Sequence, residues 1–160
     1  MSQPITLMSR RSLLTLAAAA ALTGTASAII ADEATVVVHK DPNCGCCTGW
    51  VQHLRDSGFT VRVEETSDLD SIRARLGVPT ELAACHTAEV AGYLVEGHVP
   101  AEAVRRLLVE RPNARGIAVP GMPVGSPGME GGRSQPYAVV LFGADGQRPF
   151  MRFVGKQATT

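Results

Sequence analysis

The chain has 160 residues, of which 45% are hydrophobic and 4% aromatic, and its 15 Lys and Arg residues balance 15 Asp and Glu residues. This length fits one compact domain preceded by a removable segment, and the composition excludes a disordered or fibrous chain. Because the chain has no excess of basic residues that could bind a phosphate backbone, we expect no nucleic acid partner.

Residues 1–28 carry the pattern of an export signal. Arg10 and Arg11 precede an apolar run over 13–22, and Ala26-Ser27-Ala28 follows as a cleavage site. The apolar run, about ten residues long, is too short to cross a membrane, so we expect cleavage and no stable membrane span. Residues 9–14 also resemble a twin-arginine signal, with an ordinary secretory signal as the alternative. The segment predicts a periplasmic protein.

The first half of the mature chain predicts alternating strands and helices. A β-branched run over 35–39 predicts a buried strand, and apolar residues at helical spacing predict a helix over 46–57. An alternating strand over 59–63 and a helix over 69–76 follow, the latter ended by Gly77. This order is typical of a parallel β-α-β beginning.

The second half predicts a strand, a helix, a loop and a hairpin. A loop holding Cys85 and His86 leads into a strand over 90–95 and a helix over 100–110. Residues 119–130 are too rich in Gly and Pro for regular structure, and apolar runs over 137–142 and 149–154 flank an Asp-Gly turn. We therefore expect residues 29–160 to form one α/β domain of the thioredoxin-like class, with a mixed sheet and an inserted Gly/Pro/Met-rich loop.

Three cysteines within four residues, Cys44, Cys46 and Cys47, follow the first strand and begin the first helix. Such close neighbours make a poor set of disulfide staples, because bridged Cα atoms need a separation of about 4.4–6.8 Å. The positive end of the helix dipole stabilises thiolates, and Gly45 lets the sulfurs converge. With Cys85 as a fourth thiolate, the cluster favours soft Cu(I), in a polynuclear or shared site that holds several ions.

Three alternatives remain open at this point. Disulfide stapling is one, and mononuclear zinc held by Cys44, Cys47, Cys85 and His86 is another, although zinc leaves Cys46 unused. The third is a thioredoxin-like thiol-disulfide or copper oxidoreductase that uses Cys44 and Cys47. We expect a metal-binding protein rather than an enzyme.

Three further residues are candidate peripheral ligands: His86, with a loop or hydrogen-bonding role as the alternative, and Met122 and Met129, with anchoring of the loop as the alternative. The methionines belong to a repeated Pro-Gly-Met in the predicted loop, and thioethers suit Cu(I). An extended loop would place the two sulfurs roughly 20 Å apart, so both serve one centre only if the loop folds back. We expect His39, His98 and Trp50 to be structural and His53 to be partly exposed.

Several motifs together resemble one known family. The chain resembles the CopG-type periplasmic copper-resistance family in five motifs, at residues 40–47, 77–79, 85–88, 92–101 and 118–130. The resemblance implies a thioredoxin-like fold, copper binding through Cys44, Cys46, Cys47 and Cys85, and a part in the copper tolerance of Gram-negative bacteria. Copper ions and other periplasmic copper-handling proteins are the implied partners. Storage, transfer and redox conversion of copper all remain open as the activity.

Overall fold

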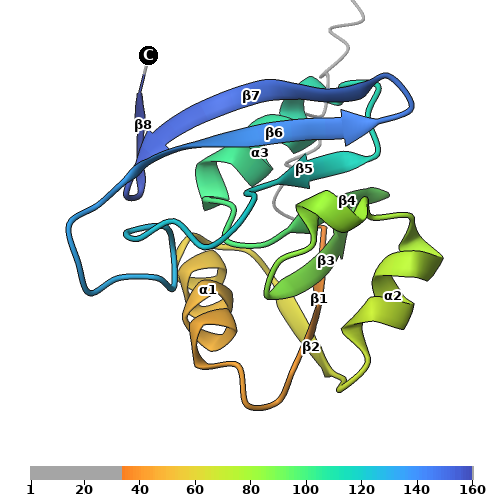
Figure 1. Cartoon of the computed structure of the whole chain (residues 1–160), viewed down its shortest axis with the longest axis horizontal. Helices are drawn as coiled ribbons and strands as arrows, with labels where there is room; N and C mark the ends of the chain where they lie inside the picture. The colour runs from red at the N-terminus through yellow and green to blue at the C-terminus, as the bar shows by residue number, and fades with distance from the viewer. Residues whose placement is uncertain (1–33, 160) are drawn as a thin grey trace, which may run out of the picture.

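A mixed sheet of eight strands runs through residues 34–159, the part of the chain that the computed structural model describes (Figure 1). Its strand order is β2-β1-β3-β4-β5-β6-β7-β8. The β1/β2 and β4/β5 pairs are parallel and the other pairs are antiparallel. In chain order the elements are β1 (Val36–Lys40), α1 (Gly45–Asp56), β2 (Val61–Glu65), α2 (Leu69–Leu76), η2 (Thr80–Leu82), β3 (His86–Val90), β4 (Tyr93–Glu96), α3 (Ala101–Glu110), β5 (Gly116–Ala118), β6 (Pro136–Gly143), β7 (Gly146–Val154) and β8 (Gln157–Thr159).

The two faces of the sheet carry separate cores. Because side chains alternate along a strand, Val95 and Ile117 face a large cluster that includes Trp50 of α1 and Leu107 of α3. The adjacent residues Leu94 and Ala118 point to the opposite face, where they join Leu76 of α2 in a smaller cluster. In Figure 1, α1 and α2 accordingly lie on either side of the strands β1 and β3.

The predicted α/β class with a mixed sheet is confirmed, as are the parallel β1-α1-β2 beginning, all three helices and the β6/β7 hairpin. The prediction of one strand over 90–95 was wrong. Two strands, β3 and β4, pair there around a turn at Ala91 and Gly92, both with positive φ. His86 therefore begins β3 instead of lying in a loop. The short strands β5 and β8 were not predicted.

The predicted export signal, residues 1–28, lies outside the described residues. Within residues 34–159, no helix is long and apolar enough to cross a membrane.

Candidate metal centre

The start of α1 positions the cysteine cluster. After β1, the Asn43 amide donates to Asp41 Oδ1 at 2.7 Å and the Cys44 amide to the Asp41 carbonyl at 3.1 Å, which closes a tight turn. Cys44 is then the N-cap of α1, and its Sγ accepts from the Cys47 amide at 3.3 Å. Sulfur thus takes the capping role that an oxygen usually fills at a helix start, where unpaired amides favour negative charge.

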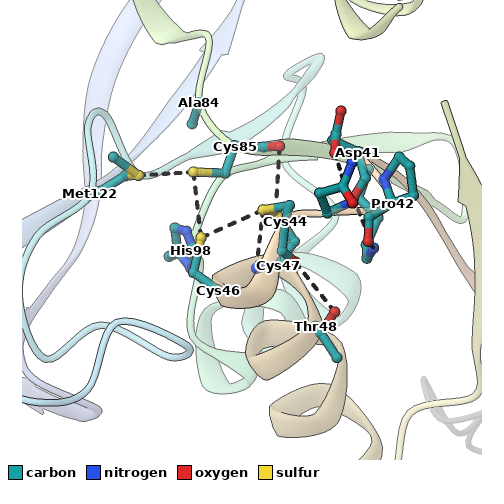
Figure 2. The surroundings of a disulfide bond; sticks show 12 residues. Asp41, Pro42, Cys44, Cys46, Cys47, Thr48, Ala84, Cys85, His98 and Met122 are labelled. Atoms are coloured by element: carbon teal, nitrogen blue, oxygen red, sulfur yellow. Dashed lines mark hydrogen bonds between the residues drawn. A yellow bond between two sulfur atoms is a disulfide. The ribbon is translucent and has the colours of Figure 1, made fainter. Parts of the chain in front are cut away.

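Four cysteine sulfurs converge at this point, all within 4.8 Å of one another (Figure 2). Cys44 and Cys47 form a disulfide, whereas Cys46 and Cys85 are free. The Sγ of Cys46 lies 3.5 Å from that of Cys44 and 3.8 Å from that of Cys85. The structure therefore brings together the four cysteines that the sequence singled out, with one pair oxidised.

A buried ion pair fixes the backbone just before Cys85. Glu96 at the end of β4 is fully buried, and its Oε1 accepts from Arg73 Nε of α2 at 3.0 Å and from the Ala84 amide at 2.7 Å. The Arg73 guanidinium also donates to the Ala84 carbonyl, and Thr87 Oγ1 donates to Glu96 Oε2 at 2.5 Å. Both polar groups of the Ala84 backbone are thus held. We refer to Arg73 and Glu96 as the clamp.

The clamp was missed by sequence reasoning. The sequence pattern of the helix predicts a solvent-exposed side chain for Arg73, and its partner Glu96 lies 23 residues further along the chain. The one available signal was Glu96 itself, an acid at the end of an apolar strand, since acids are rarely fully buried without a partner. Burial raises the pKa of Glu96 even though Thr87, Ala84 and Arg73 all donate to it.

The Gly/Pro/Met-rich loop folds back over the cluster, and Met122 Sδ lies 2.8 Å from Cys85 Sγ (Figure 2). The backbone of Gly128 packs directly against α1. A Cβ at this residue would lie only 2.3 Å from the Cys46 carbonyl oxygen, so no side chain fits there. The Pro127 carbonyl accepts from buried His98 at 2.8 Å. Met129 is half-buried in the same loop, and its amide donates to Ser126; whether its sulfur binds metal stays a prediction.

His86 is fully buried, and its ring is tilted by 39° against Trp50 at 4.3 Å and lies edge-on to His98 at 5.1 Å between ring centroids. Among the described residues, neither His86 ring nitrogen has a hydrogen-bond partner. Burial lowers the pKa of His86 well below its ordinary value, so the ring is neutral. His86 is not part of the converging group of ligand atoms, and its ligand role stays a prediction.

The remaining histidines have structural contacts. Buried His39 lies 3.4 Å from Glu64 and 3.0 Å from Glu89, and His53 accepts from the Ala101 amide at the start of α3. Trp50 is buried in the core, as expected.

The free thiol of Cys85 is held in its protonated form. Burial first, and then the neighbouring Cys46, raise the pKa of Cys85 to about 11. A metal ion that binds here must displace the thiol proton, so metal binding is coupled to proton release.

Fold and site together define a small mixed α/β protein with a cysteine cluster that could hold a metal ion at the start of a helix. Residues 82–129 match the family described as "Protein of unknown function, DUF411". A solved structure named "Copper resistance protein copG- Form 2" is 44% identical, covers 75% of this chain and 98% of its own, and superposes with a TM-score of 0.71. The corresponding Form 1 is 45% identical, with coverages of 76% and 98% and a TM-score of 0.71. The chain belongs to this CopG-type copper-resistance family. No curated protein matches it.

Proposed function

We propose that this protein binds Cu(I) in the periplasm through the thiolates of Cys44, Cys46, Cys47 and Cys85, in a polynuclear or shared site, and so contributes to copper tolerance. The convergence of four cysteine sulfurs within 4.8 Å carries the proposal. Two sulfurs about 2.3 Å from one metal ion lie at most about 4.6 Å apart, which is close to the 4.8 Å bound on the cluster, so the four sulfurs can share a metal site once the Cys44–Cys47 disulfide is reduced. Soft sulfur ligands select Cu(I), and the relatives are named copper resistance proteins.

The composition of the cluster favours copper over structural zinc. A zinc site built from Cys44, Cys47, Cys85 and His86 would leave Cys46 aside, yet Cys46 lies in the converging group and His86 does not. Cys46 also stands between the other sulfurs, in contact with both Cys44 and Cys85. Such an intermediate thiolate suits a shared site, where one sulfur bridges two ions.

The Cys44–Cys47 disulfide favours a second candidate function, that of an oxidoreductase. The bond joins the N-cap to the first turn of α1, directly after a central strand, and this placement also supports the thioredoxin-like grouping of the fold. Reduction would take two electrons and two protons from a thiol donor and leave two thiols. Metal-free protein would then reduce a model disulfide catalytically, and Cys46→Ser would keep that activity.

Anaerobic titration of the fully reduced protein with Cu(I), against a chromophoric competing chelator, tests the copper proposal. We expect tight binding of at least one Cu(I), and we expect Cys46→Ser to bind less copper while its circular dichroism stays unchanged. Wild-type protein that loses all Cu(I) to the chelator, or a Cys46→Ser titration identical to wild type, would contradict the proposal.

A further inference from the structure

Three sulfurs remain available when the Cys44–Cys47 disulfide is formed. Cys46 and Cys85 are free thiols with their Sγ atoms 3.8 Å apart, and Met122 Sδ lies 2.8 Å from Cys85 Sγ. In Figure 2, dashed lines join Met122 of the loop to Cys85, and Cys85 to Cys46 of the helix. We infer that Cys46, Cys85 and Met122 form a Cu(I) site of their own that persists in the disulfide form, so that the disulfide sets how much copper the protein holds. This inference rests on the proposed function and adds a site and a redox control to it.

The spacing of the two thiols fits one ion. In trigonal coordination, with metal–sulfur distances of about 2.3 Å, neighbouring sulfurs lie about 4.0 Å apart. The observed 3.8 Å between Cys46 and Cys85 is close to this value. Met122 lies nearer to Cys85 than it would around an ion, and the sulfur of a flexible side chain that is 52% exposed can move outward to make room.

Each of the three ligands comes from a separate, anchored segment. Cys46 lies in the first turn of α1, under the backbone of Gly128. The clamp holds the backbone before Cys85 from both sides. Met122 belongs to the loop that the His98–Pro127 hydrogen bond ties down. Because none of these supports involves the disulfide, the site is preorganised in the oxidised protein.

The chemistry of the two forms differs by two thiolates. In the disulfide form, one Cu⁺ displaces the protons of Cys46 and Cys85 and is held by two thiolates and the neutral Met122 thioether, with two protons released. A reductant then supplies two electrons to the disulfide, whose S–S bond breaks to leave two thiols. With a phosphine, one water molecule supplies the oxygen of the phosphine oxide and the two protons of the new thiols. With a dithiol, the reductant gives up its own two thiol protons and becomes a disulfide. The two new thiols of Cys44 and Cys47 can lose their protons to further Cu⁺.

The test compares two redox forms of the purified wild-type protein under anaerobic conditions. Thiol counting and mass spectrometry first establish two free thiols in one form and four in the phosphine-reduced form, from which the phosphine is then removed. Each form is titrated with Cu(I) against a chromophoric chelator. We expect one Cu(I) in the disulfide form, coordinated by three sulfurs in X-ray absorption spectra, and more than one in the reduced form.

Variants identify the ligands. Met122→Leu should lower the Cu(I) affinity of the disulfide form at least tenfold, whereas Met151→Leu, a matched change on β7, should leave it unchanged. The Cys44→Ser/Cys47→Ser double variant should bind one Cu(I) both before and after phosphine treatment. Circular dichroism of each variant checks folding.

The inference is overturned if the disulfide form binds no Cu(I) while the reduced form does, if both forms bind the same number, or if Met122→Leu binds as tightly as Met151→Leu. Failure of the reduced wild-type protein to bind any Cu(I) is a separate outcome, since it removes the proposed function as well.

Discussion

The clamp offers the sharpest test of how the fold positions Cys85. Glu96→Gln keeps the shape of the side chain and an oxygen that can accept from the Ala84 amide, but it removes the negative charge beside Arg73. Arg73 could still donate to this oxygen and to the Ala84 carbonyl, but its remaining charged partner would be Asp70, whose side chain is 96% exposed. The variant therefore isolates the charge from the packing.

The expected loss of stability follows from burial. Glu96 is 0% exposed, and breaking a buried ion pair from one side costs about 3–5 kcal/mol because the remaining charge is left uncompensated. Because Glu96→Gln retains hydrogen bonds and Arg73 keeps its contact with Asp70, we expect a loss of stability at the lower end of this range, about 3 kcal/mol. That is a large part of the about 5–15 kcal/mol by which a domain is usually stable.

Glu110→Gln is the matched control. Glu110 pairs with Arg106 at 2.7 Å on the surface of α3, with both side chains 45% exposed. Exposed pairs four residues apart on a helix contribute about 0.3–0.5 kcal/mol, so the same substitution should have little effect there.

Urea unfolding of the copper-free disulfide form measures both variants, and the alkylation rate of Cys85 reports on its position. We expect Glu96→Gln to lower the unfolding midpoint strongly and to speed alkylation, while Glu110→Gln does neither. Equal midpoints for the two variants, together with unchanged alkylation, would refute a positioning role for the clamp.

Two further predictions concern the loop and α3. Gly128→Ala should destabilise the protein by about 1–3 kcal/mol more than Gly121→Ala in urea unfolding, since both residues have positive φ but only Gly128 lies against α1; equal losses would refute the close approach. Burial lowers the pKa of His53 below 6.5, so its neutral ring, which accepts from Ala101, favours folding above pH 6.5, and this contribution is lost as pH falls through the lowered pKa. Between pH 7.5 and 5.5 wild-type protein should therefore lose more stability than His53→Gln, whose amide oxygen accepts without titrating, and equal losses would contradict this.

Local patterns made much of the fold and part of the site predictable. The β1-α1-β2 unit has clear periodicity, and Cys44, Cys46 and Cys47 are brought together by one helix turn, so both could be inferred from short stretches of sequence. The β3/β4 hairpin could not, because its turn begins at Ala91, a residue that rarely adopts a positive φ. Strand β8 was missed because all three residues of Gln157–Thr159 are exposed and show no apolar pattern.

Contacts across the fold set the rest of the site. The contact between Met122 and Cys85 depends on the path of the loop over residues 119–130, which its Gly- and Pro-rich composition does not determine. The close approach of Gly128 to α1 and the hydrogen bond from His98 to Pro127 fix this path. The Arg73–Glu96 pair depends on how α2 packs against β4, which no local pattern encodes.

Cys46 connects the two chemistries proposed for this protein. Its sulfur lies 3.5 Å from Cys44, one half of the disulfide, and 3.8 Å from Cys85, which contacts Met122. A Cu(I) ion held by Cys46 and Cys85 would therefore lie beside the disulfide, and reduction of the disulfide would add two thiolates next to an ion already in place. Copper binding and thiol redox chemistry then act on one cluster, with Cys46 as the shared ligand. In this arrangement Cys46→Ser would remove the Cu(I) site of the disulfide form, whereas reduction of the variant would still make the thiols of Cys44 and Cys47 available beside Cys85.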